Sequence, residues 1–580
     1  MKEELLKKLA QTVKKLSITV DSIDLEYPES ADHGDYSSNI AMAHAKALKM
    51  SPKALAEKIV DEFQKDMPAC VESVSVAGPG FINFKIKDVV FAEQIVKGDK
   101  VQDQGLKVQG EKKKVMVEYT DPNPFKVFHI GHLMANAIGE SVARLVEHEG
   151  AEVVRACYQG DVGLHVAKTI WSCLQNKDDF EKWKDTPLLN RISLLGFAYA
   201  QGSNFYDSVL NDKARKEIDA LNKKIFEKSD KEINEMYDLG RKWSLEYFDI
   251  IYNRLGTKFD TFFFESAVAD DGIKIVRDSL AKGIFTESDG AVVFKGEEYG
   301  LHTRVFITSQ GLPTYEAKEL GLNTDKFKKY PDLDQSIIVT ANEQSDYFKV
   351  VLKAFSLINP EIYQKTKHVS HGLLRFASGK MSSRKGHVIS AENLINEIKV
   401  LVIERIKDRG FAANEIEEVS DIIAIGAIKY TILRQAIGSD VVFDSAKSIS
   451  FEGDSGPYLQ YSVVRANSII EKAKKEGIIK NDQLSITNDT IKLQEKVGLL
   501  EKLIVRFPDV VERASKELAP QHVANYLINL AGAFNSFYAG NTIVSVEEPL
   551  SPYRIALTKS FIATMSEGLH ILGIRIPKRM

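Results

Sequence analysis

Two histidines three residues apart are the first candidates for chemistry in this chain. His129 and His132 stand in His129-Ile-Gly-His132, where a short apolar run gives way to a long helical pattern. As metal ligands they would need a further His, Cys or carboxylate at suitable spacing, and none is obvious nearby. As phosphate binders they fit better, because a helix N-terminus attracts anions and Gly131 permits close approach of a ligand. Two capping or core histidines are the alternative interpretation of this segment taken alone.

A second candidate is a cationic loop, Gly379-Lys-Met-Ser-Ser-Arg-Lys-Gly386. Three cations and two hydroxyls between glycines are suited to clamping a triphosphate, as phosphoryl and nucleotidyl transfer require. Taken alone, such a run is more often a solvated surface loop. Only together with the histidine segment does it favour a nucleotide site.

The elements expected around the histidines form a βαβ unit. The pattern predicts a short strand at residues 115–120, a long helix at 131–150 and a second strand at 151–161. Such a unit implies a parallel sheet that binds its ligand at the carboxyl ends of the strands. Further strand signals follow at 290–296, 302–309 and 334–342.

The whole chain divides by pattern into three parts. We predict an α/β protein with a Rossmann-like parallel-sheet catalytic core at residues 106–392, interrupted by a charged helical insertion at about 175–260. An N-terminal α+β module is expected at 1–105, with the polar stretch 101–113 as its linker. Residues 393–580 are almost entirely helical in pattern and are expected to form an all-α bundle.

Composition limits the function classes. The 580 residues carry 77 Lys and Arg against 81 Asp and Glu, a net charge of −4, so nucleic-acid contacts must come from local basic patches. Three cysteines cannot form a disulfide framework and none lies in a CxxC pair, so we expect a cytoplasmic protein without a structural metal. Apolar runs are too short for a membrane span, so no membrane partner is expected.

Together, His129-Ile-Gly-His132 and Lys380-Met-Ser-Ser383 resemble the paired signatures of class I aminoacyl-tRNA synthetases. Two four-residue matches in this order, with βαβ signals around the first, make chance a poor explanation. Wider blocks resemble the arginyl-tRNA synthetase family over nearly the whole chain. These blocks are residues 33–46, 76–86, 117–133, 289–320, 456–469 and 569–580.

This resemblance implies an arginine pocket. Glu118 and Asn123 match the family's acceptors for the substrate amine and carboxylate region, while Tyr315 and Glu319 match its tyrosine and acidic positions. The family usually has Asp at the position of Glu319, so this carboxylate would sit further out. Carboxylates suit the task because a guanidinium is always charged and donates through five N–H groups. A further pocket glutamine is assigned to Gln344, with Glu343 as the alternative.

The resemblance also implies the co-substrates. ATP, accompanied by Mg²⁺, would be contacted by His129, Gly131, His132, Lys380, Met381, Ser382 and Ser383. Lys126 and Lys380 would hold the leaving pyrophosphate, so catalysis would rest on positioning and electrostatics. The arginyl group would pass to tRNA(Arg), and the protein is expected to act as a monomer.

Contacts with tRNA are expected from both ends of the chain. Base stacking and phosphate contacts are assigned to Tyr36, Asn39, Tyr458, Tyr461 and Arg465. For each of these aromatic residues, packing inside the protein is an equal alternative.

Three other functions compete with this interpretation. A class I synthetase for cysteine or lysine would keep the two signatures, but scattered cysteines argue against a zinc-dependent cysteine enzyme. An inactive, synthetase-like RNA-binding protein is disfavoured by the intact His129, His132, Lys380 and Ser382. A small-molecule nucleotidyltransferase would leave the helical C-terminal third unexplained.

Overall fold

The structure is a computed structural model. It describes residues 1–20, 22–28, 31–101, 112–208, 211–377, 390–479, 484, 486, 490–491, 494 and 496–580. The cationic loop 379–386, and with it Lys380, Met381, Ser382 and Ser383, lies outside the described residues, as does most of the expected linker. The chain forms two compact units, one made of 1–104, 468–506 and 536–561 and the other of 105–467, 507–535 and 562–580.

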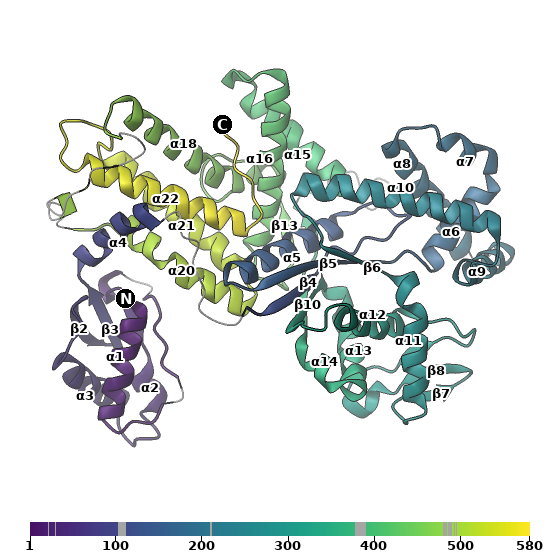
Figure 1. Ribbon diagram of the computed structural model, residues 1–580, viewed down its shortest axis with the longest axis horizontal. Helices are drawn as coiled ribbons and strands as arrows, with labels where there is room; N and C mark the ends of the chain where they lie inside the picture. The colour runs from purple at the N-terminus through teal and green to yellow at the C-terminus, as the bar shows by residue number, and fades with distance from the viewer. Residues whose placement is uncertain are drawn as a thin grey trace. The chain divides into compact units, whose positions relative to one another are not determined.

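A parallel sheet forms the centre of the larger unit, as the sequence predicts, and it has five strands (Figure 1). Its strand order is β11 (Thr366–His371), β10 (Gln335–Ala341), β4 (Lys114–Glu118), β5 (Glu152–Gln159), β6 (Thr261–Phe264), and all four pairings are parallel. Val115, Met116 and Val117 are buried in succession because helices cover both faces of the sheet. All five strands therefore end at one edge, where a ligand is expected.

Two helix layers enclose this sheet. The helix α5 (Ile130–His148) contacts β4, β5 and β10 on one face, and α11 (Glu265–Leu280) and α12 (Tyr315–Lys329) pack on the other (Figure 1). The latter two approach closely because a Cβ on Gly272 or Gly321 would overlap the backbone of the partner helix. The remaining helices of this layer are α13 (Ser345–Ile358) and α14 (Pro360–Lys365).

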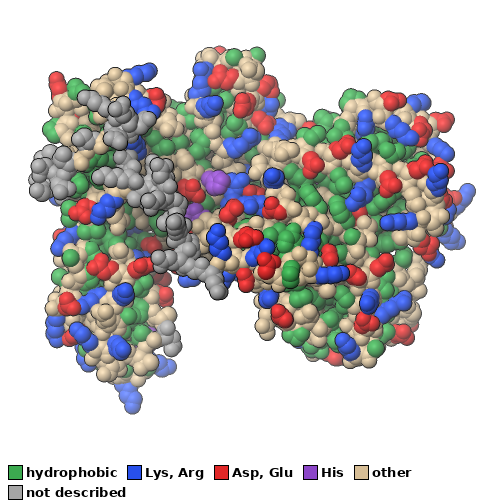
Figure 2. Space-filling model, viewed as in Figure 1, with side chains coloured by type: hydrophobic (Ala, Val, Ile, Leu, Met, Phe, Trp, Pro, Cys, Tyr) green, Lys and Arg blue, Asp and Glu red, His purple; other side chains and the backbone are tan. Residues whose placement is uncertain are grey.

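The strand signals at 290–296 and 302–309 do not join the parallel sheet. They form β8 (Ala291–Phe294) and β9 (Arg304–Ile307), which with β7 (Thr286–Ser288) make a separate antiparallel sheet. Alternation alone could not distinguish the two sheets, because both bury apolar residues. The helices α6 (Leu164–Gln175), α7 (Lys177–Trp183), α8 (Leu188–Asp207), α9 (Asp212–Glu227) and α10 (Lys231–Leu255) follow β5. Figure 2 shows lysines and acids interspersed over α7–α10, as pairs such as Lys182–Asp179 illustrate.

The smaller unit contains the N-terminal module. Its antiparallel sheet has the order β1 (Tyr36–Ser38), β3 (Phe81–Ile86), β2 (Val71–Ala77), flanked by α1 (Lys2–Lys15), α2 (Ile40–His44), α3 (Pro52–Gln64) and α4 (Asp88–Val101). Buried Asp35 accepts from the backbone N–H of Ile86 at 2.9 Å and pairs with Lys502 at 2.8 Å. The module thus shares its unit with part of the C-terminal helices.

The C-terminal region is largely helical, as expected. It contains α15 (Ala391–Ile406), α16 (Ala413–Leu433), α17 (Ser445–Ser448), α18 (Gly456–Lys475), α20 (Leu499–Glu517), α21 (Gln521–Gly540) and α22 (Ser551–Ile571). One short strand, β13 (Val441–Phe443), pairs in parallel with β12 (Leu374–Phe376). Among the described residues, no helix combines the length and apolar character needed to cross a bilayer.

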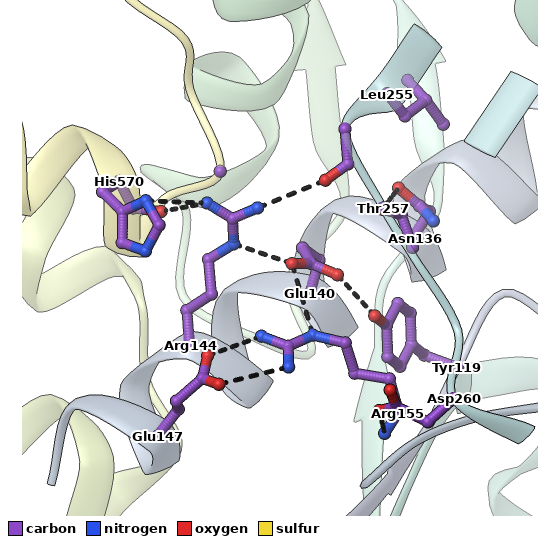
Figure 3. A network of polar contacts seen from close by, with 12 residues as sticks. Tyr119, Asn136, Glu140, Arg144, Glu147, Arg155, Leu255, Thr257, Asp260 and His570 are labelled. Atoms are coloured by element: carbon purple, nitrogen blue, oxygen red, sulfur yellow. Dashed lines mark hydrogen bonds and ion pairs between the residues drawn. The ribbon is translucent and has the colours of Figure 1, made fainter. Parts of the chain in front are cut away.

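A buried polar network fixes the carboxyl end of β4 (Figure 3). The hydroxyl of Tyr119 donates to Glu140 on α5, which also accepts from Arg144 at 2.7 Å. Arg144 in turn donates to Nδ1 and the carbonyl oxygen of His570, at 3.2 and 2.8 Å. Nearby, buried Lys429 donates to the carbonyl oxygens of Leu255 and Gly573 at 2.7 and 2.8 Å. The C-terminal residues therefore help to support the parallel sheet.

Candidate active site

The two histidines cap the N-terminus of α5. His129 is the N-cap residue, and its Nδ1 accepts from the backbone N–H groups of Gly131 and His132, at 3.1 and 3.4 Å. The Nδ1 of His132 accepts from the backbone N–H of His129 at 3.2 Å, and the two rings stack with centroids 3.6 Å apart. Gly131 is required because a Cβ there would press on the His129 ring.

This capping fixes the tautomer of both rings. A backbone N–H can only donate, so each Nδ1 carries no proton and each neutral ring holds its proton on Nε2. Burial and nearby Lys126 lower the pKa of His129 to about 4, and burial with His129 holds the pKa of His132 well below its usual value. The pair therefore presents Nε2–H groups as neutral hydrogen-bond donors near pH 7. The sequence predicts only that the helix N-terminus attracts anions, and the structure adds which atoms of the two histidines can donate.

A line of polar residues on α12 faces the end of β4. Glu319, Asn323 and Lys326 recur at helical spacing on a buried helix. Asn323 donates to Glu319 Oε1 at 2.8 Å, and Lys326 Nζ lies 2.8 Å from a carboxylate oxygen of Glu118. Burial, followed by the charge of Glu118, raises the pKa of Glu319 to about 7. The predicted acids Glu118 and Glu319 are thus brought into one pocket.

A second ion pair lies in the same pocket. Lys318 Nζ donates to Glu265 at the start of α11, and it stands 4.4 Å from the centroid of the Tyr315 ring. Tyr315 is 57% exposed, so its ring forms the outer wall, while Glu265 and Lys318 are buried. Tyr347 on α13 donates to the carbonyl oxygen of Tyr315 at 3.0 Å and ties the wall to the next helix.

The remaining predicted residues line the approach to the pocket. The amide oxygen of Asn123 occupies the space where a Cβ on Gly160 would lie. Lys126 lies 4.9 Å from the centroid of the Tyr199 ring on α8. Gln344 and Glu343 are both exposed, in the short turn after β10. No described contact favours either as a pocket residue.

Sequence reasoning missed several pocket residues. One signal was available: Asn323 and Lys326 continue the face of Glu319 at i+4 and i+7 of the same helix. Of the others, two lie beside predicted residues, Asp121 between Glu118 and Asn123 and Lys318 next to Glu319, and the remaining three come from other segments. These five missed residues are Asp121, Tyr158, Glu265, Lys318 and Tyr347.

The residues assigned to tRNA differ in accessibility. Tyr36 is 3% exposed and its ring lies 5.2 Å from that of Tyr27, so the expectation of base stacking fails for this residue. Its position in a strand of the module's core explains the burial. Asn39 is exposed at the start of α2. Tyr458, Tyr461 and Arg465 are half-buried on α18, and Asn535 donates to the Tyr458 hydroxyl at 2.6 Å.

Comparisons with known proteins agree with this geometry. Residues 95–445 match the model of the catalytic domain of class I tRNA synthetases (R), residues 459–580 a DALR anticodon binding domain, and residues 3–86 an arginyl tRNA synthetase N terminal domain. Arginine–tRNA ligase of Clostridium botulinum (strain Alaska E43 / Type E3) is 32% identical over 99% of both chains. The chain belongs to the arginyl-tRNA synthetase family.

Solved structures show the same fold. An arginyl-tRNA synthetase of Thermus thermophilus superimposes with a TM-score of 0.78 at 22% identity, over all of both chains. That of Plasmodium falciparum gives 0.78 at 19% identity, over 100% of this chain and 99% of its own. Membership of the arginyl-tRNA synthetase family confirms the class expected from the two signatures and makes the chain an aminoacyl-tRNA synthetase, a ligase. The predicted domain boundaries and individual site residues stay predictions.

Proposed function

We propose that this chain joins L-arginine to tRNA(Arg) in two steps at the carboxyl edge of the parallel sheet. In the first, a carboxylate oxygen of arginine attacks the α-phosphorus of ATP, and the bond to pyrophosphate breaks. In the second, a ribose hydroxyl at the 3′ end of the tRNA attacks the arginyl carbonyl, and AMP leaves.

The observation that carries this proposal is the acidic pocket between α12 and β4. Four buried or half-buried carboxylates, those of Glu118, Asp121, Glu265 and Glu319, converge there, and only two of them have a lysine partner among the described residues. Uncompensated carboxylates in a buried site favour a cationic ligand. A guanidinium meets this demand because it stays charged at every pH below about 12.

The residues act by positioning and by electrostatic stabilisation. Glu319 and Tyr315 hold the guanidinium end, and Asn123 lies toward the substrate carboxylate. The Nε2–H groups of His129 and His132 donate to phosphate oxygens, where charge shifts as the α-phosphorus is attacked. Lys126 and, from the loop outside the described residues, Lys380 neutralise the departing pyrophosphate, with Mg²⁺ arriving as part of the ATP substrate. No side-chain nucleophile takes part.

For tRNA, the proposal retains Asn39 on the N-terminal module and Tyr461 and Arg465 on α18. The last two lie four residues apart, on one face of the helix. Stacking of bases on tyrosine and contacts of arginine with phosphate are the usual modes for unpaired RNA. We further propose that the protein acts in the cytoplasm, because all three cysteines are free and buried, and that it acts as a monomer.

The test is to charge total tRNA with each radiolabelled amino acid in turn. Retention of arginine alone supports the proposal, and retention of another amino acid, or of none, contradicts it. Light scattering of the purified chain checks the monomer. A matched control is the His132→Ala variant, which should fail to charge while still binding arginine.

A further inference from the structure

An uncommon backbone conformation lies next to a residue that is proposed to hold pyrophosphate. Between β4 and α5, Phe125 has a φ of 68°, in the left-handed region that bulky side chains rarely adopt. Phe125 directly precedes Lys126, whose side chain lines the approach to the pocket. A conformation of this kind persists only where the surrounding structure holds it, and such residues cluster at functional sites. The contacts of Phe125 therefore show what fixes the position of Lys126.

Helix α10 holds Phe125 through both its backbone and its ring. The backbone N–H of Phe125 donates to Ser244 Oγ at 2.9 Å, and the Ser244 hydroxyl donates in turn to the carbonyl oxygen of Gly240 at 2.8 Å. The one proton of this hydroxyl is thus used within α10, and a lone pair faces Phe125. Tyr237 stacks on the Phe125 ring with centroids 6.1 Å apart, and a Cβ on Gly240 would overlap that ring. Phe125 and Ser244 are both buried, so water does not readily replace the serine as acceptor.

The same face of α10 holds the chain on the other side of Lys126. The ring of Phe128 packs edge-on against the rings of Phe248 and Tyr252, with centroids 6.2 Å apart in each pair. Ser244, Phe248 and Tyr252 follow one another at intervals of four residues, so they lie on one face of the helix. Lys126 therefore stands between two buried aromatic residues that this face of α10 fixes.

Buried Asp161 ties α10 to the parallel sheet. It comes two residues after the end of β5 and accepts from the Tyr237 hydroxyl at 3.1 Å and from Arg241 Nε at 2.9 Å, both on α10. It also accepts from the backbone N–H and the hydroxyl of Ser266, at 2.9 and 2.7 Å, in the first turn of α11. Because α10 is bound to two elements that form the pocket, the helix sets the position of the segment that holds Lys126.

We propose that Ser244 is a positioning residue for the ATP step, because it holds Phe125 in the left-handed conformation that places the Lys126 ammonium beside the departing pyrophosphate. This assignment rests on the proposed function and deepens it. Without the serine oxygen, the buried N–H of Phe125 loses its acceptor and the backbone relaxes toward negative φ, which moves Lys126. Lys126 meets charge that develops as pyrophosphate leaves, so the loss belongs to turnover and not to arginine binding.

Arginine-dependent pyrophosphate exchange, with total tRNA present, and calorimetric titration with arginine test the assignment. Ser244→Ala should lower kcat, counted per arginine-binding site, about ten- to a hundred-fold, because a misplacement of about an ångström costs rates of this order. Its Kd for arginine should change by less than about twofold. Ser244→Thr retains the hydroxyl and should keep kcat within about threefold of the parent protein. Where the alanine variant folds poorly, Ser244→Cys, of similar size and with a weaker acceptor, should show the same selective loss.

Ser420→Ala is the matched control. Ser420 is buried on α16, and its hydroxyl also donates to a carbonyl oxygen of its own helix, that of Glu417 at 3.2 Å. This variant should leave kcat per arginine-binding site unchanged. An unchanged kcat in Ser244→Ala, an equal loss in Ser420→Ala, a loss of arginine affinity in place of kcat, or a threonine variant as slow as the alanine variant overturns the role of Ser244. If the parent protein catalyses no arginine-dependent exchange, the proposed function itself has failed and the assignment with it.

Discussion

Replacing Glu319 by glutamine separates recognition from stability in this pocket. The side chain is 4% exposed and accepts from Asn323 at 2.8 Å, a bond that a glutamine oxygen can keep. The change therefore preserves shape and removes one charge. A hydrogen bond to a charged group contributes about 1.5–3 kcal/mol, so arginine affinity should fall about ten- to a hundred-fold.

The same substitution should stabilise the free protein. Burial and Glu118 raise the pKa of Glu319 from 4.5 to about 7. Because one pKa unit corresponds to about 1.4 kcal/mol, the ionised carboxylate destabilises the fold by on the order of 3 kcal/mol above pH 7. At pH 8 the variant avoids this penalty, so its melting temperature should rise by a few degrees.

Arginine-dependent pyrophosphate exchange and thermal melting at pH 8 measure both effects. Discrimination between arginine and neutral citrulline should fall by the same factor as arginine affinity. Glu316→Gln is the control on the same helix: Glu316 pairs with Arg304 at 3.1 Å, so that variant should lose stability and leave the arginine Michaelis constant unchanged. Unaltered arginine binding by Glu319→Gln would place this carboxylate outside the pocket, and a lowered melting temperature would show that it has a cationic partner.

Four further outcomes are expected. Arginine affinity should rise roughly tenfold from pH 6 to pH 8, because the carboxyl of Glu319, with its pKa raised to about 7, must lose its proton to pair with a guanidinium; a flat titration would contradict this, and Glu319→Gln should show a weaker pH dependence than the parent protein. His132→Ala should lower the rate of arginine activation far more than arginine affinity, since its Nε2–H faces charge that develops during the reaction; normal turnover with a raised Michaelis constant for arginine would refute that role. Tyr315→Phe should lower arginine affinity less than tenfold, because a neutral hydroxyl contributes only about 0.5–1.5 kcal/mol. A larger loss of affinity in equilibrium binding would contradict this. Burial lowers the pKa of Lys429 to about 7, so the parent protein should gain stability relative to Lys429→Met as pH rises from 7 toward 10.5. Thermal melting of both proteins at each pH measures this, and a difference in melting temperature that does not change with pH would contradict the lowered pKa.

Local pattern was enough to predict the parts of the site that lie within one element. The helix after His129 begins at Ile130, and Tyr315 and Glu319 fall on one helix, because apolar periodicity and a strand-to-helix junction are properties of neighbouring residues. The parallel arrangement of the sheet followed from the same βαβ order.

The ion pairs of the pocket could not be predicted in this way. Lys326 meets Glu118 across more than two hundred residues, and only the packing of α12 against the sheet brings them together. Tyr36 is a second residue whose environment could not be predicted. As an aromatic residue in a polar segment it is expected to stack on RNA bases, but in the structure it is buried in the core of the N-terminal module. Whether an aromatic ring faces solvent or the interior depends on its partners, here Tyr27, which the spacing of residues does not reveal.

The hydrogen bonds from Arg144 to His570 and from Lys429 to Gly573 bear on the order in which this enzyme folds during its synthesis. During translation, the sheet, α5 and α16 leave the ribosome long before residues 570–573 have been made. Until then two basic side chains of the nascent catalytic unit lack acceptors that they have when mature, and a buried charge without its acceptors is costly. We therefore expect the docking of residues 570–573 onto α5 and α16 to be a late step of maturation, and a chain interrupted before residue 570 should remain open to proteases instead of persisting as a partly active synthetase.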